Sequence, residues 1–186
     1  ENYEQFRNSK KDIDVFFVTT LYPQPKYRDL VAQRRVLVDG LNKYGQFNII
    51  ARYVCPGKTG EEECGPFETE LMDYREYLEY SARSRLGIYI RGNHDGLSFK
   101  FGELMAMGKP IVGEKLMNNR DNMYAYNRFE EQFAYDDPAE LIDRVIYLLQ
   151  NPQELEELRR VNIETFDNHF TPKPVVKGIL DQIGVF

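Results

Sequence analysis

An uninterrupted run of β-branched and aromatic residues near the start of the chain constrains the fold most strongly. This run, Ile13–Thr20, reads Ile-Asp-Val-Phe-Phe-Val-Thr-Thr. It has little of the apolar–polar alternation of a strand with one wet face, and it is typical of a strand buried on both faces of a parallel sheet. We expect further strands in the apolar segments Phe47–Val54, Leu86–Ile90, Pro110–Gly113 and Gln132–Tyr135.

Segments with helical spacing of apolar residues separate these runs. One helix of about four turns carries Leu30, Leu37, Val38 and Leu41 on one face, and another is marked by Tyr74, Tyr77, Leu78 and Ala82. Further helices are predicted over about Ser98–Met107, from Pro138 and from Pro152. Strands that alternate with helices predict right-handed βαβ units, so the fold class expected is α/β, a doubly wound parallel sheet of the Rossmann-like kind.

Length and composition fit one domain over residues 1–186, with C-terminal helices over about 152–186. The chain is 42% hydrophobic and 29% charged, which is typical of a globular protein. Its formal net charge of −6 gives no field to hold nucleic acid. No apolar run is long enough for a transmembrane segment, and the polar start Glu1–Asp12 is unlike a signal peptide, so we expect a cytoplasmic location. Without an initiator Met, the chain is interpreted as a fragment of something larger.

Two cysteines, Cys55 and Cys64, bracket a loop rich in Gly, Pro and Glu. No His lies near them to complete a zinc site, and the chain has no secretory signal. We expect reduced thiols here in preference to a disulfide or a metal.

The loop after the Leu86–Ile90 segment carries the residues with the clearest chemistry. Ligands of doubly wound sheets bind beyond the carboxyl ends of the strands, and this rule selects the loops Thr19–Arg28 and Arg91–Ser98. Gly92 and Gly96 give the second loop freedom to approach a ligand, and Ser98 can cap the following helix. The start of that helix is therefore a ready site for an anion.

The helix itself adds a cation and a carboxylate. Lys100 and Glu103 are at i and i+3, so they share a face and can address a phosphate and a sugar hydroxyl side by side. Asp95 precedes Glu103 by eight residues and can reach the same ligand from the loop. Gly102 costs helix stability, which suggests a close approach to its backbone, and packing against another helix is the alternative. Helix capping by Asp95 and solvent exposure of Glu103 are the structural alternatives for the two acids.

These motifs resemble a known family. An acidic residue, seven others and Glu, followed by Met-Ala-x-Gly-Lys-Pro-Ile-Val, is similar to the C-terminal, donor-binding half of GT-B glycosyltransferases of group 1, including the spore-maturation-protein branch. The helix sequence Tyr-Arg-Glu-Tyr-Leu-Glu-Tyr-Ser-Ala and the later Asp-Asp-Pro-Ala-Glu-Leu also resemble that branch. The resemblance covers roughly Asp14 to Leu180, and its specific part is Asp95–Val112.

The resemblance implies a role for each site residue. Glu103 would hold the ribose hydroxyls of a nucleotide-sugar, and Asp95 would contact the transferred sugar, although most family members have Glu there. Asp95 and Lys100 are the catalytic candidates. The candidates for donor binding, through backbone amides, charge or the imidazole, are Arg28, His94, Gly96, Leu97, Ser98 and Glu103.

The implied activity is that of a hexosyltransferase-like glycosyltransferase that needs no metal and no cofactor. Its partner is a nucleotide-diphospho-sugar, and a missing N-terminal acceptor domain would supply the second half of the GT-B fold. The chain alone would then bind donor without turning it over. Two alternatives stay open: an exostosin-like transferase half, and a non-catalytic flavodoxin-like binding or interaction module.

Overall fold

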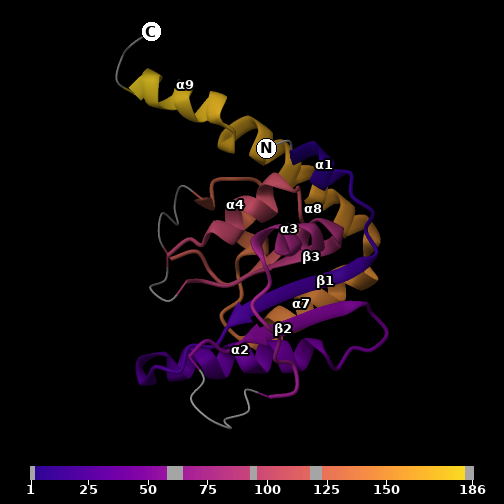
Figure 1. The fold of residues 1–186 in the computed structure, drawn as a ribbon. Helices are drawn as coiled ribbons and strands as arrows, with labels where there is room; N and C mark the ends of the chain where they lie inside the picture. Colours follow the sequence, from indigo (N-terminus) through magenta and orange to yellow (C-terminus); the bar gives the residue numbers. More distant parts are fainter. Residues whose placement is uncertain (1–2, 58–64, 93–95, 118–122, 183–186) are drawn as a thin grey trace.

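Four parallel strands form a sheet at the centre of the molecule, in the order β2-β1-β3-β4 (Figure 1). The computed structural model describes residues 3–57, 65–92, 96–117 and 123–182, and the structural statements below concern these residues. The strands are β1 (Ile13–Thr20), β2 (Ile49–Val54), β3 (Ser84–Tyr89) and β4 (Ile111–Gly113). β1 pairs with both β2 and β3, as expected for the most apolar run of the sequence.

Helices connect the strands and follow the last one. Those before β4 are α1 (Tyr3–Arg7), the short 3₁₀ helix η1 (Pro25–Tyr27), α2 (Arg28–Leu41), α3 (Tyr74–Arg83) and α4 (Phe99–Ala106). Those after β4 are α6 (Phe129–Gln132), α7 (Pro138–Gln150), α8 (Pro152–Thr165), the π-helical turn η2 (Phe166–Phe170) and α9 (Pro172–Gln182). α3 and α7 each begin at an aspartate, Asp73 or Asp137, whose side chain accepts a backbone N–H of the first turn.

The sheet is covered on both faces. Val15 and Phe17 of β1 belong to the core cluster that contains the apolar faces of α2 and α7. Phe16 points the other way and stacks on Tyr80 of α3, with 5.3 Å between ring centroids. α4 lies close to β3, because a Cβ atom at Gly87 would come within 2.7 Å of the Leu104 side chain. The predicted doubly wound, Rossmann-like α/β fold is therefore confirmed.

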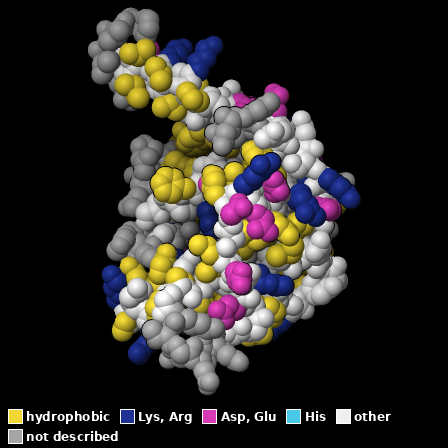
Figure 2. All heavy atoms as spheres, in the orientation of Figure 1, with side chains coloured by type: hydrophobic (Ala, Val, Ile, Leu, Met, Phe, Trp, Pro, Cys, Tyr) yellow, Lys and Arg dark blue, Asp and Glu magenta, His cyan; other side chains and the backbone are white. Residues whose placement is uncertain are grey.

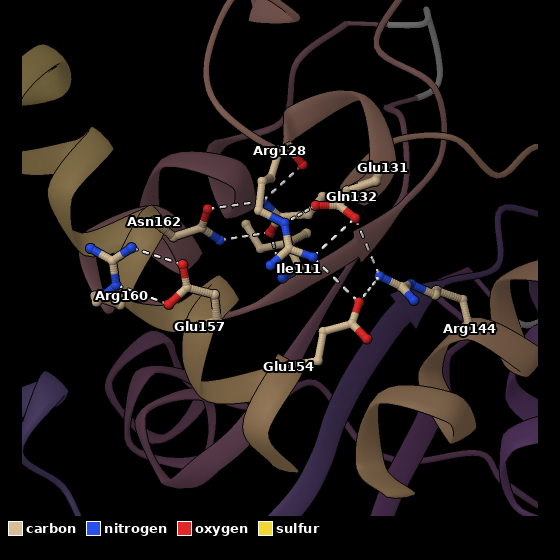
Figure 3. Close-up of polar contacts among 9 residues, drawn as sticks. All are labelled: Ile111, Arg128, Glu131, Gln132, Arg144, Glu154, Glu157, Arg160 and Asn162. Carbon is tan, nitrogen blue, oxygen red and sulfur yellow. Dashed lines mark hydrogen bonds and ion pairs between the residues drawn. The ribbon is translucent and has the colours of Figure 1, made fainter. Parts of the chain in front are cut away.

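The buried side-chain amides of Gln132 and Asn162 form hydrogen bonds with backbone groups along the free edge of the sheet, at β4 (Figure 3). Gln132 accepts from the Ile111 backbone N–H at 3.1 Å. Asn162 donates to the carbonyl of Lys109, which precedes β4, at 2.6 Å. The two amides also bond reciprocally, at 3.0 and 2.7 Å. Because unpaired backbone groups at a buried edge are costly, this pair replaces a fifth strand.

The predicted strand Gln132–Tyr135 is wrong. Gln132 ends helix α6, and the backbone hydrogen bond described between this segment and β4 runs from the Tyr135 N–H to the Gly113 carbonyl, at 3.2 Å. The aromatic side chain of Phe133, which suggested a strand, is buried against Tyr89 and Phe101 instead. Tertiary packing of aromatic rings here outweighs β propensity.

The expectation of reduced cysteines is also wrong, because Cys55 is disulfide-bonded. Cys64, the other cysteine of the chain, lies outside the described residues. Disulfides are found mostly in proteins of oxidising compartments. The cytoplasmic location expected from the sequence stays a prediction.

Helix α9 extends away from the body of the molecule (Figure 1), and Figure 2 shows hydrophobic side chains gathered along it. Val175, Val176 and Ile179 are among these exposed apolar residues. Within the described part of the chain, no helix has the length and apolar character required to cross a bilayer.

Candidate functional site

A pocket of about 550 Å³ opens at the carboxyl ends of β1 and β3. We call it the carboxyl-end pocket. Its polar and aromatic walls come from five segments: the end of β1, α2, α3, the loop after β3 and the start of α4. The lining residues include Thr19, Thr20, Arg34, Tyr74, Tyr77, Arg91, Gly92, Ser98, Lys100 and Glu103. The pocket lies where ligands of doubly wound sheets bind.

The loop after β3 is closed by a hydrogen bond between two glycines. The Gly92 N–H donates to the Gly96 carbonyl at 3.2 Å, and a Cβ atom at Gly92 would lie 3.4 Å from that oxygen. Asn93, His94 and Asp95 lie outside the described residues, so the predictions for His94 and Asp95 stay predictions. Leu97 follows the loop with about half of its surface exposed.

Ser98 is the N-cap residue of α4, but its side chain does not cap the helix. Its hydroxyl oxygen is buried at the wall of the carboxyl-end pocket and has no hydrogen-bond partner among the described residues. A backbone hydrogen bond from Ser98 reaches the Tyr89 hydroxyl, while burial raises the pKa of Tyr89 to about 12. The Ser98 backbone is thus already engaged, while its buried hydroxyl has no hydrogen-bond partner among the described residues.

Lys100 lines the pocket from the first turn of α4. Its ammonium donates to the Val18 carbonyl at 2.5 Å and lies 5.3 Å from the centroid of the Tyr77 ring. Burial lowers the pKa of Lys100 to about 8, against the opposing effect of Glu103. The side chain is therefore a cation at neutral pH that sits close to its titration range.

Glu103 faces the same pocket one turn further along α4, as its spacing from Lys100 predicts. The Tyr74 hydroxyl of α3 donates to Glu103 Oε1 at 2.8 Å. No described residue donates to the other carboxylate oxygen. The carboxylate is thus held in place with one oxygen left to accept a hydrogen bond.

Arg34 is a pocket residue that the sequence interpretation missed. Although it is only 6% exposed, it lines the pocket from α2 and donates to the Thr20 carbonyl at 2.6 Å and the Arg91 carbonyl at 3.3 Å. The signal was present in the sequence, because an arginine within the apolar face of a helix needs a polar partner. Arg28, predicted instead, is exposed at the start of α2 and is not among the residues that line the pocket.

An ion-pair network fixes the rim of the pocket. Glu114, which is 8% exposed, accepts from the Arg91 backbone N–H at 2.7 Å and from Arg91 Nε at 3.3 Å. Arg91 also pairs with Asp136 at 3.3 Å, and Asp136 pairs with Lys115 at 3.0 Å. Ion pairs therefore connect the loop after β3 with the segment after β4.

For Gly102 the sequence suggests either a close approach to the helix backbone or packing against another helix. A Cβ atom at Gly102 would meet nothing within 4 Å, so no helix packs closely on that position. Gly102 instead lines a pocket of about 350 Å³ beside Phe99 and Tyr74. Among the described residues, no group of three or more His, Cys, Asp or Glu side chains could hold a metal ion.

Comparison with known proteins finds similarity both to a sequence family and to solved structures. The sequence model of a family described as "Glycosyl transferase-like" matches residues 34–181. The structure titled "Crystal Structure of TarM" superimposes with a TM-score of 0.58 at 11% sequence identity. That alignment covers 92% of this chain but 35% of the TarM chain, so this chain spans about a third of that protein. No curated protein matches the sequence.

Proposed function

Since this chain belongs to the glycosyl transferase-like family and has the fold of one half of a GT-B glycosyltransferase, we propose that the carboxyl-end pocket binds a nucleotide-diphospho-sugar. The observation that supports this most is the joint placement of Glu103, Lys100 and the start of α4 around one pocket. Family membership also favours a transferase domain over the alternative of an interaction module.

In this proposal Glu103 binds the ribose. The Tyr74 hydroxyl occupies Oε1, and Oε2 accepts a hydrogen bond from a ribose hydroxyl. A hydrogen bond to a charged acceptor is among the stronger ones. The Tyr74 contact fixes the carboxylate before the donor arrives, so less side-chain entropy is lost on binding.

The diphosphate lies against Lys100 and the start of α4. An ammonium has three donors, and the Val18 carbonyl uses one of them. The helix dipole, the buried Arg34 guanidinium and the Ser98 hydroxyl add further stabilisation of negative charge. These groups would stabilise the nucleoside diphosphate as it departs from the sugar.

Transfer completes the proposed reaction. The sugar, a hexose in this proposal, would lie toward the loop that carries His94 and Asp95, and its acceptor would be held by a second domain. The proposed transfer uses lysine, arginine and a helix dipole in place of a divalent metal.

Calorimetric titration with a panel of nucleoside diphosphates tests the proposal. At least one diphosphate should bind the wild type, and Glu103→Ala should weaken it by at least tenfold, which is about 1.4 kcal/mol. Glu164→Ala is the matched control, because Glu164 is an exposed helical glutamate of α8 that pairs only weakly with Arg160, at 3.4 Å. Circular dichroism should show the same fold in all three proteins. Equal affinity in Glu103→Ala, or no binding of any diphosphate, would contradict the proposal.

A further inference from the structure

A second pocket, of about 340 Å³, lies at the opposite end of the sheet. We call it the amino-end pocket. It is bounded by the start of β3, the residues just before β4, and α8. Five of its lining residues are basic, namely Arg7, Lys11, Arg85, Lys109 and Arg159, and one, Glu156, is acidic. Positive charge is thus concentrated here in a chain whose net charge is −6.

The three arginines of this pocket have carboxylate partners. The ion pairs are Arg7 with Asp167 at 2.8 Å, Arg85 with Asp14 at 2.7 Å and Arg159 with Glu156 at 3.0 Å. These pairs hold the guanidinium groups in place around the pocket. None of these carboxylates pairs with Lys11 or Lys109.

The two lysines share an acceptor. Lys109 is 1% exposed and donates to the Ala82 carbonyl at 2.8 Å and to the Ser84 carbonyl. Lys11 donates to the same Ala82 carbonyl at 2.5 Å. No described carboxylate forms an ion pair with either ammonium. The side-chain nitrogens of two lysines therefore converge on one carbonyl oxygen, with no described carboxylate between them.

Protonation of both Lys11 and Lys109 is unfavourable unless a ligand supplies negative charge. Burial, helped by the neighbouring Lys11 and by the charge of Arg159, lowers the pKa of Lys109 to about 6. Burial also lowers the pKa of Lys11. Carbonyls at the end of α3 explain why one ammonium binds there, because they carry the negative end of the helix dipole. They do not stabilise a second ammonium beside it, since like charges close together repel, so Lys109 is mainly a neutral amine at pH 7 until an anion arrives.

We propose that the amino-end pocket binds the phosphate group of a small phosphorylated molecule. A phosphate would lie between Lys11 and Arg159 and balance the Lys109 charge behind them, with charge-assisted hydrogen bonds of the stronger kind. The pocket has room for more than the phosphate, and its volume is in the range of sites for small ligands. The site is separate from the carboxyl-end pocket and does not depend on the function proposed there.

Thermal unfolding and calorimetry with two probes, inorganic phosphate and glycerol 3-phosphate, test this site at constant ionic strength. Both probes should raise the melting temperature of the wild type saturably, and tighter binding of the ester would identify a phosphomonoester as the ligand. Lys11→Met and Arg159→Gln should each weaken binding at least tenfold while keeping the far-ultraviolet spectrum. Arg75→Gln is the control, because Arg75 is an exposed arginine paired with Glu79 on α3.

Two further measurements establish which cations bind the phosphate. Lys100→Met, which alters the carboxyl-end pocket, should leave the response intact. At pH 7 the heat of binding should depend on the ionisation enthalpy of the buffer, because Lys109 takes up a proton when an anion arrives. The proposal would be overturned by a wild type with no saturable response, by wild-type affinity in both Lys11→Met and Arg159→Gln, or by a response that is lost only in Lys100→Met.

Discussion

Tyr74 makes Glu103 a more rigid group than its exposed position on α4 suggests. The hydroxyl of Tyr74 donates to Oε1, so the carboxylate is directed before any ligand binds. Removing this hydroxyl leaves the charge in place but frees the side chain to rotate. Tyr74 is therefore proposed as a positioning residue, and Glu103 as a ligand-binding residue.

Tyr74→Phe should weaken the nucleoside diphosphate that binds the wild type by about fivefold, close to the ~1 kcal/mol of a typical hydrogen bond. The effect should disappear in the Glu103→Ala background, since the tyrosine acts through that carboxylate. Calorimetry of the four proteins gives this coupling directly. Tyr80→Phe, on the same helix and stacked on Phe16, is the control. Additive losses would show that Tyr74 contacts the ligand independently.

The lowered pKa of Lys100 predicts how the affinity for the donor depends on pH. Its pKa is lowered to about 8 by burial, so the free protein loses this cation as pH rises through 8. A bound diphosphate favours the ammonium and raises its pKa, so above pH 8 binding requires uptake of a proton. Affinity should then fall by at most about tenfold per pH unit. Titrations between about pH 7 and 9 check this, and Lys100→Met should bind more weakly with a flatter profile. A wild-type affinity that is constant over this range would contradict the proposed phosphate contact.

The strands and long helices were predictable because each carries its own signal. β1 begins and ends where the run Ile13–Thr20 predicts, and α7 begins at Pro138 as its Asp-Pro start predicts. Glu103 and Lys100 were found by helical spacing and resemblance. Arg34 was not, because its role depends on α2 lying beside the carboxyl ends of β1 and β3. The sequence shows an arginine within an apolar helix face, but which pocket that arginine lines is set by the topology of the fold.

At the scale of elements, the Gln132–Asn162 pair in Figure 3 determines how α6 and α8 attach to β4. Both side chains are almost fully buried. Gln132→Leu removes the acceptor of the Ile111 N–H and leaves the Asn162 amide without its partner. Urea unfolding should show a loss of about 2 kcal/mol or more, because unsatisfied buried groups are costly.

The double variant Gln132→Leu/Asn162→Leu should lose less stability than the sum of the single variants, because the two amides act as one unit. Glu130→Gln, an exposed change on the same helix, should stay within about 0.5 kcal/mol of the wild type. Strictly additive losses would mean that each amide serves β4 alone.

At the scale of the whole molecule, an acidic chain has two pockets lined by basic side chains, at opposite ends of one sheet. The carboxyl-end pocket gathers Lys100, Arg34 and the start of α4, while the amino-end pocket gathers five basic side chains. The negative charge elsewhere repels anions, so anionic ligands are directed toward these two places. Helix α4 lies between them, because its first turn lines one pocket and Met107 after its last turn lines the other.

This charge distribution predicts how the donor pocket responds to divalent metals. If Lys100, Arg34 and the helix dipole neutralise the diphosphate, its affinity should stay within about twofold, or ~0.4 kcal/mol, in EDTA and in Mg²⁺. Both titrations must have the same ionic strength, because salt screens these interactions. Lys100→Met provides the contrast: with one cation removed, Mg²⁺ should restore part of the lost affinity by supplying charge. A wild type that binds only with the metal present would show that the protein's own cations are insufficient, and it would contradict the metal-independent reaction proposed for this domain.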